Sequence, residues 1–108
     1  MALADQCFDF TAKADSAHYQ LCWFHKITMR KPGGSKSKIG GWNGGTRERE
    51  EPDQGGLEWD KGDWCWKGGL KATRVELMCG LENSLDLVME VAPCRYLARF
   101  STPAVCSL

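Results

Sequence analysis

The chain has 108 residues, of which 43% are hydrophobic, and its 14 basic residues balance its 14 acidic residues. This length allows one domain with a modest hydrophobic core. Because the charge is balanced, no overall field would attract a nucleic acid or an anionic membrane, and we expect neither as a partner. The sequence also lacks an apolar run of about 18 residues, which argues against a transmembrane helix.

Cysteines are distributed along the whole chain, at Cys7, Cys22, Cys65, Cys79, Cys94 and Cys106. Their number is even, and no two of them form the C-x-x-C pair that is typical of zinc and redox sites. We therefore expect three disulfides made in the secretory pathway, with no bound metal and no cofactor. Spacing alone leaves all 15 pairings open. Residues 1–5 lack the apolar core of a signal peptide, so we expect this oxidised domain to belong to a larger precursor.

The first region with strand character extends from Gln6 to Thr28. Aromatic and other β-favouring residues are concentrated in the segments CFDF and HYQLCWFHKIT. These segments predict two strands that form a small hairpin unit.

The second region, Met29 to Gly62, is rich in glycine and charged residues, as in KPGGSKSK, GGWNGG and TREREEPDQGG. This composition predicts a loop, with room for short strands around Ile39–Trp42 and Leu57–Trp59. The mixed-charge run Arg47–Glu51 is expected to be a solvated loop tip.

The third region, Trp64 to Val105, contains the segments ATRVELMC, LDLVMEV and CRYLARF, separated by the turn sequences GLENS and APC. Alternation in the first two segments predicts two apolar faces, made respectively by Val75, Leu77 and Cys79 and by Leu85, Leu87 and Met89. Short strands at roughly ten-residue spacing predict an all-β fold, a flattened antiparallel β-barrel or sandwich stapled by three disulfides. A helix over Leu77–Met89 is the rival prediction, but Gly80 interrupts it.

The sequence offers little for catalysis. His18 and His25 have no serine or carboxylate at a spacing that would indicate a triad. The glycine-rich segments lack the strand, GK[ST] and helix of a phosphate-binding loop. The sequence instead has five tryptophans, two tyrosines and many charged residues. These residue types are typical of sugar-binding surfaces, since indole faces pack against the C–H face of a pyranose and polar groups bond to its hydroxyls.

Four motifs carry a more specific resemblance. They are Gly62-Asp-Trp-Cys65-Trp66-Lys-Gly68, Arg74-Val-Glu-Leu-Met-Cys79-Gly80, Glu90-Val-Ala-Pro-Cys94-Arg-Tyr96 and Thr102-Pro-Ala-Val-Cys106. Together with Tyr19-Gln-Leu-Cys22-Trp-Phe24, they resemble the mannose 6-phosphate receptor homology (MRH) domain, most closely the version in glucosidase II β subunits. The resemblance covers residues 6–107, which we take as a single lectin-like domain. Residues 1–5 are then a linker or foreign to the domain, and residues 32–56 a long variable loop region.

The resemblance implies a flattened β-barrel and a pairing of the cysteines, namely Cys7 with Cys22, Cys65 with Cys94 and Cys79 with Cys106. It also implies a mannose site made by Gln, Arg, Glu and Tyr with an assisting Trp. Glu90 and Tyr96 match the family's Glu and Tyr, and Trp42 takes the place of the assisting Trp. Met29 stands where the family has Gln, and Lys71 where it has Arg.

These two departures bear on the strength of binding. Methionine offers only a weak sulfur acceptor, and lysine lacks the planar fork of arginine. Each lost contact costs about 1 to 3 kcal/mol, so together they predict a site weakened by roughly two to four orders of magnitude. Arg30 and Arg74 are candidate substitutes, but regular strands would direct both to the opposite face.

The resemblance thus implies a non-catalytic, carbohydrate-binding domain of a regulatory β subunit in the endoplasmic reticulum lumen. Its expected partners are the mannose arms of high-mannose N-glycans and, through the rest of the precursor, a separate catalytic glycosidase subunit. The alternatives are a degenerate domain that acts as a structural or protein-interaction module, and a related lectin of endoplasmic-reticulum degradation.

Overall fold

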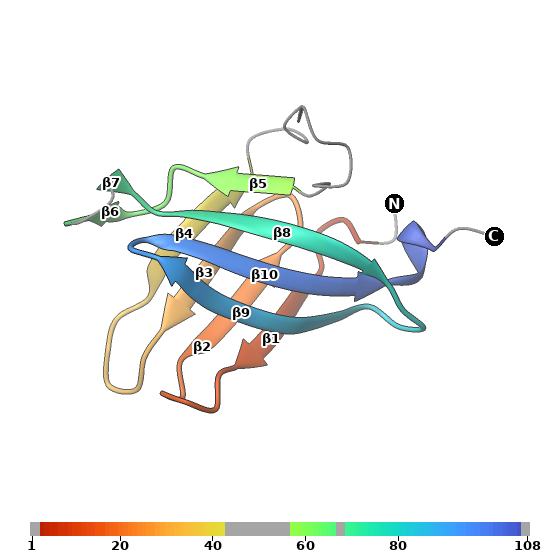
Figure 1. The fold of residues 1–108 in the computed structure, drawn as a ribbon, viewed down its shortest axis with the longest axis horizontal. Coiled ribbons are helices and arrows are strands. Elements are labelled where there is room, and N and C mark those ends of the chain that lie inside the picture. The colour runs from red at the N-terminus through yellow and green to blue at the C-terminus, as the bar shows by residue number, and fades with distance from the viewer. Residues whose placement is uncertain (1–2, 43–56, 67–68, 107–108) are drawn as a thin grey trace.

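The computed structural model describes residues 3–42, 57–66 and 69–106 (Figure 1). Strands make up most of this part of the chain, and a single turn of 3₁₀ helix, Pro103–Val105, follows the last strand. The strands are β1 (Cys7–Thr11), β2 (His18–Cys22), β3 (Lys26–Arg30), β4 (Ser37–Trp42), β5 (Leu57–Asp60), β6 (Trp64–Cys65), β7 (Gly69–Leu70), β8 (Ala72–Cys79), β9 (Ser84–Ala92) and β10 (Arg95–Thr102). Within the described residues, no helix is long and apolar enough to cross a membrane.

Eight strands form one sheet in the order β1-β2-β3-β4-β5-β8-β10-β9, and β6 and β7 form a separate two-stranded ribbon. All pairs are antiparallel except β8 and β10, which run parallel. Figure 1 shows the sheet folded over so that β8, β10 and β9 lie across β1–β4, with β5 at the bend. The two outer strands, β1 and β9, come into contact, and the sheet is therefore a nearly closed, flattened barrel as predicted.

Aromatic side chains from both layers fill the interior. Trp23 lies between Trp59 and Phe100, with ring centroids 5.7 Å and 5.1 Å away in edge-to-face orientation. Phe8 of β1 adds a further edge contact to Phe100 of β10 at 4.9 Å, which joins the two layers. Such pairs add about 0.5 to 1.5 kcal/mol each beyond the burial of apolar area. The core therefore holds the two layers together where backbone pairing does not.

Three disulfides join Cys7 to Cys22, Cys65 to Cys94 and Cys79 to Cys106. This is the pairing that the resemblance implies. The bridge between Cys65 and Cys94 connects the β6–β7 ribbon to the turn between β9 and β10. That link fixes the position of a ribbon with only two residues in each strand.

The N-terminal region contains three strands and not the two that were predicted. The segment His18–Thr28 was expected to be one strand, but it turns at residues 23–25 and divides into β2 and β3. Phe24 adopts a positive φ of 67° at this turn, a conformation that glycine or asparagine usually signals. Because a phenylalanine takes it here, the sequence carries no turn signal, and Met29 and Arg30 lie in β3 and not in the predicted loop.

Both short strands expected in the second region are present, within β4 and β5. Position 40 in β4 requires glycine, since a Cβ there would lie 2.5 Å from the carbonyl oxygen of Trp59. The charged run Arg47–Glu51 lies outside the described residues.

Leu85, Leu87 and Met89 do not share one buried face of β9, contrary to the prediction. Leu85 and Val88 are buried instead, three residues apart. The register with β10 shifts at this point, because Phe100 pairs with Leu85 while Arg99 pairs with Leu87. The extra residue between the two leucines is a bulge, which reverses the alternation of faces.

The packed part of the domain begins before the expected boundary at residue 6. Leu3 is buried in the core, and Asp5 Oδ1 accepts a hydrogen bond from His25 Nε2 at 2.8 Å. Residues 3–5 therefore belong to the folded unit.

Candidate functional site

Two adjoining hollows open on the surface, and Glu90 lines both of them. The narrow hollow encloses about 190 Å³. The wide hollow encloses about 620 Å³. Glu90 lies near the end of β9, so the two hollows meet at one edge of the sheet.

Two cross-strand pairs form the walls of the narrow hollow. Tyr19 lies opposite Met29 in the register of β2 and β3, and Glu90 lies opposite Tyr96 in the register of β9 and β10. The other residues that line it are Ala12, Ala14, Asp15, Lys31, Val88 and Met89. Met29, Glu90 and Tyr96, three of the residues predicted for the site, thus come together although they are far apart in the sequence.

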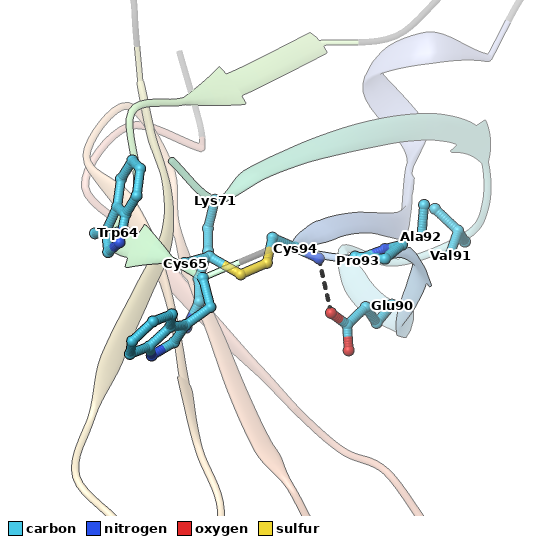
Figure 2. Close-up of a pocket in the computed structure, with 9 residues that line it drawn as sticks. Trp64, Cys65, Lys71, Glu90, Val91, Ala92, Pro93 and Cys94 are labelled. Atoms are coloured by element: carbon cyan, nitrogen blue, oxygen red, sulfur yellow. Dashed lines mark hydrogen bonds between the residues drawn. A yellow bond between two sulfur atoms is a disulfide. The ribbon is translucent and has the colours of Figure 1, made fainter. Parts of the chain in front are cut away.

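The carboxylate of Glu90 has a fixed position. Its Oε2 accepts a hydrogen bond from the backbone N–H of Cys94 at 2.9 Å (Figure 2). Cys94 stands in the turn after β9 with a positive φ of 64°, and its disulfide to Cys65 anchors that turn. Among the described residues Oε1 has no hydrogen-bond partner, so one carboxylate oxygen is available to a ligand.

The two phenols of the narrow hollow are protonated at neutral pH. Burial raises the pKa of Tyr96 to about 12, and the negative charge of Glu90 and the neighbouring Tyr19 add to the effect. The pKa of Tyr19 is raised first by burial and then by the charges of Asp15 and Glu90. Neither phenol bonds to another side chain in the described part of the chain, so each can donate a hydrogen bond to a ligand.

Lys71, unlike Met29, Glu90 and Tyr96, does not line the narrow hollow. It lines the wide hollow, where its Nζ donates a hydrogen bond to Ser37 Oγ of β4 at 2.7 Å. Backbone hydrogen bonds also hold this residue, from Gly62 N to its carbonyl at 2.8 Å and from its own N–H to Asp63 O at 3.0 Å. Lys71 therefore lines the wide hollow together with Glu90, and its amine is tethered to Ser37, the residue that pairs with Met29 in the register of β3 and β4.

The five tryptophans divide into two groups. Trp23 and Trp59 are buried, and Trp42 packs edge-to-face on Phe24 and Trp59 with centroids 5.1 Å from each. Trp42 lines neither hollow. Trp64 and Trp66, by contrast, are 71% and 95% exposed and line the wide hollow. Figure 2 shows Trp64 across the Cys65–Cys94 bridge from Glu90.

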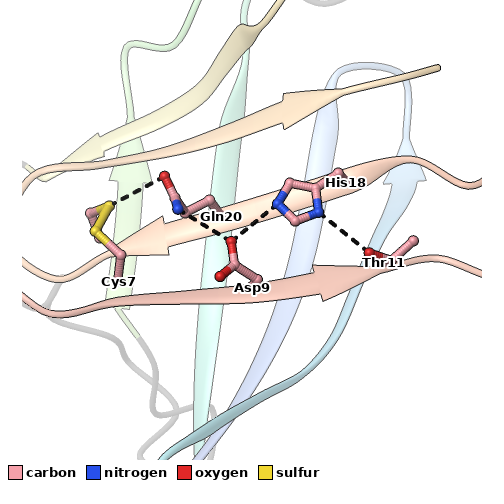
Figure 3. A network of polar contacts seen from close by, with 6 residues as sticks. Cys7, Asp9, Thr11, His18 and Gln20 are labelled. Atoms are coloured by element: carbon pink, nitrogen blue, oxygen red, sulfur yellow. Dashed lines mark hydrogen bonds and ion pairs between the residues drawn. A yellow bond between two sulfur atoms is a disulfide. The ribbon is translucent and has the colours of Figure 1, made fainter.

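A second polar cluster lies on the outer face of β1 and β2 (Figure 3). His18 Nδ1 is 3.3 Å from Thr11 Oγ1, its Nε2 is 3.1 Å from Asp9 Oδ1, and Gln20 Nε2 donates to the same oxygen at 3.2 Å. This chain of contacts from hydroxyl to imidazole to carboxylate resembles the catalytic triad of a hydrolase. None of these residues lines either hollow, however, and a triad acts only beside a cleft with oxyanion donors. We interpret the cluster as cross-strand pairing.

Residues 4–108 match the family described as "Glucosidase II beta subunit-like protein". The chain belongs to this family. The predicted resemblance is thereby confirmed over nearly the whole chain.

Similar proteins carry the same name in distant organisms. "Glucosidase 2 subunit beta" of Oryza sativa subsp. indica is 35% identical over 102 residues, which cover 94% of this chain and 15% of the relative. The Homo sapiens protein of that name is 33% identical over 106 residues, which cover 96% of this chain and 19% of the relative. The chain therefore spans less than a fifth of the length of these curated relatives.

The fold also matches a solved structure of the family. The "MRH domain of Glucosidase II beta bound to mannose" superposes with a TM-score of 0.72 at 22% identity, covering 98% of each chain. Identity at this level shows the fold, and the predicted MRH-type barrel is confirmed.

Sequence reasoning missed three polar residues of the narrow hollow in this glucosidase II beta-like domain, namely Asp15, Tyr19 and Lys31. Tyr19 belongs to a recognised motif, and its pairing with Met29 would have revealed it if β2 and β3 had been separated. Arg30 and Arg74, the candidate substitutes, line neither hollow.

Proposed function

We propose that this domain is a lectin that binds a mannose residue of high-mannose N-glycans in the narrow hollow. One observation carries the proposal: Glu90 presents an open carboxylate oxygen beside the protonated phenols of Tyr96 and Tyr19. A carboxylate accepts hydrogen bonds from two sugar hydroxyls, and phenols donate to the ring and hydroxyl oxygens. The family match and the mannose-bound structural neighbour support the choice of sugar.

The lining of the narrow hollow suits one sugar ring. Met29, Val88 and Met89, together with two alanines, offer apolar surface, whereas the charged and phenolic groups stand at other points of the wall. A pyranose has the same division, with C–H groups on its faces and hydroxyls around its rim. Apolar contact supplies affinity and the polar groups select the sugar.

In this proposal the wide hollow receives the rest of the glycan. Trp64 and Trp66 are exposed indoles with no ring partner among the described residues, and both line this hollow together with Glu90. Indoles of this kind pack on sugar rings at small cost in conformational entropy. We therefore assign sugar stacking to Trp66, and to Trp42 a supporting role through its contacts with Phe24 and Trp59.

We further propose that the domain acts in the endoplasmic reticulum lumen as part of a regulatory β subunit. Binding mannose arms would bring glycoprotein substrate to a separate catalytic subunit. This role requires no nucleophile or general base in either hollow, and the three disulfides suit an oxidising compartment.

One observation favours the second candidate, a degenerate domain with weak or no sugar binding. The amine of Lys71 is bonded to Ser37 and lines only the wide hollow, while Met29 brings a thioether to the narrow one. Two of the family's contacts are thus missing from the place where Glu90 and Tyr96 meet.

Titration with methyl α-mannopyranoside, followed by amide chemical shifts, decides between the two. We expect shifts at Tyr19, Glu90 and Tyr96, and no comparable shifts with the galactose analogue. Glu90→Gln should weaken binding at least tenfold, because it replaces a charged acceptor by a neutral one. Glu82→Gln, at an exposed position in the turn before β9, is the matched control. If mannoside and galactoside give the same absence of shifts, the lectin proposal is wrong.

A further inference from the structure

We propose that Lys31, and not Lys71, supplies the cationic hydrogen-bond donor to the bound sugar. This inference rests on the proposed mannose site and names a contact within it. The family position of the cation is filled by Lys71, whereas the lining of the narrow hollow contains one cation among the described residues, Lys31.

Lys31 is placed by the backbone that follows β3. It lies two residues after Met29, so the two side chains share one face of the extended chain. Its carbonyl accepts a hydrogen bond from Gly34 N at 2.8 Å, and Gly33 between them has a φ of 75°. With Pro32 at the second position, this is the pattern of a type II turn. The turn fixes the direction in which Lys31 leaves β3.

The charges of the lining favour an ammonium group at the narrow hollow. Asp15 and Glu90 bring two carboxylates to the same lining, and the phenols of Tyr19 and Tyr96 are neutral. The net charge of the lining without Lys31 is therefore negative, and this attracts its amine. Among the described residues the amine makes no hydrogen bond or ion pair.

The amines of Lys31 and Lys71 thus differ in how readily they can contact a ligand in the narrow hollow. Lys71 Nζ donates one of its three N–H groups to Ser37 Oγ at 2.7 Å, and this bond restrains the amine beside β4. Lys31 has three free N–H donors, and a flexible stem that can direct them at the sugar rim. A lysine two residues beyond the position of the lost glutamine can therefore replace part of what Met29 removed.

Four single variants test this inference in methyl α-mannopyranoside titrations. Lys31→Met, which keeps the length of the stem, should lower affinity at least tenfold, or about 1.4 kcal/mol. Lys31→Arg should keep affinity within threefold, and Lys71→Met should change it less than twofold. Lys26→Met, at the opposite end of β3, is the matched control and should bind as the parent does.

Carbon-13 shifts of the lysine side chains give a direct readout that a purely structural role would not move. The ε-carbon signal of Lys31 should shift on adding mannoside, and that of Lys71 should not. A Lys31→Met variant that binds like the parent, while Glu90→Gln loses binding, overturns this inference and leaves the lectin function intact. Loss of affinity in Lys71→Met alone also overturns it. A parent chain that binds no mannoside overturns both proposals.

Discussion

The carboxylate of Glu90 accepts the backbone N–H of Cys94 at 2.9 Å, so one side chain both closes a turn and faces two hollows. Its structural and its binding roles can be separated by mutation. Glu90→Ala removes the acceptor for Cys94 N and should destabilise the domain by about 1 to 2 kcal/mol. Glu90→Gln keeps an acceptor oxygen and should stay within about 0.5 kcal/mol of the parent. Urea unfolding measures both, and equal destabilisation by the two variants would contradict this assignment.

Tyr96 predicts a loss of stability at alkaline pH. Its folded-state pKa is raised from 10.0 to about 12, so the folded protein holds the phenolic proton more tightly than the unfolded chain does. The contribution is fully present below pH 10 and is lost as the pH rises through about 12. A change in pKa from 10.0 to about 12 corresponds to about 3 kcal/mol. Urea unfolding measures the free energies of unfolding of the parent and of Tyr96→Phe at pH 9 and near pH 12. The advantage of the parent over the variant should shrink by roughly this amount between the two pH values.

The retained Tyr19 serves as an internal control, because its pKa is also raised and it remains in both proteins. Phenolate absorbance follows each ionisation in the folded state. A midpoint near pH 10 for both phenols would exclude the burial effect described above.

Trp42 and Trp66 should respond in opposite ways to truncation. Trp42→Ala removes ring contacts with Phe24 and Trp59 and should cost about 2 to 3 kcal/mol of stability. Trp66→Ala should lower the free energy of unfolding by less than about 0.5 kcal/mol, because Trp66 is 95% exposed. Only Trp66→Ala should weaken binding of a mannose oligosaccharide at unchanged stability. Unaltered oligosaccharide affinity in that variant would remove Trp66 from the site.

Restoring the family's residues should strengthen the site. Met29→Gln with Lys71→Arg is expected to raise mannoside affinity at least tenfold, about 1.4 kcal/mol, since it returns an amide and a planar fork. Most of the gain should come from Met29→Gln, because Met29 lines the narrow hollow and Lys71 does not. Calorimetric titration of the two single variants and the double variant measures the contributions. An unchanged affinity in a folded protein would support the structural-module alternative, and a reduced one would indicate a different set of contacts.

Much of the fold follows from local sequence. Alternation along β10 buries Tyr96, Ala98, Phe100 and Thr102 in turn, and such a pattern is readable without coordinates. The break at Phe24 and the bulge before Leu87 are not readable, because neither contains glycine or proline. Both depend on packing between the layers, which no local pattern encodes.

The same limit applies to the site. Motif spacing predicts Glu90, Tyr96, Met29 and Lys71 as site residues, but their division between two hollows depends on cross-strand register and on the bond from Lys71 to Ser37. Lys31 has no motif of its own, and only the turn after β3 brings it to the narrow hollow. The family pattern therefore selects residues that line a hollow, but it does not predict which hollow each one lines.

The seam between β1 and β9 gives the narrow hollow a further property. The segment after β1 supplies one wall and β9 supplies the other, and no backbone ladder joins these two strands in the described part of the chain. A ligand bound there would contact both walls and so connect the two outer strands of the barrel. By linkage, a ligand at one hundred times its dissociation constant would stabilise the folded state by about 2.7 kcal/mol. Amide hydrogen exchange along β1 and β9 should slow accordingly. Ligand binding in the narrow hollow would therefore stabilise two strands that lie at opposite ends of the sheet order.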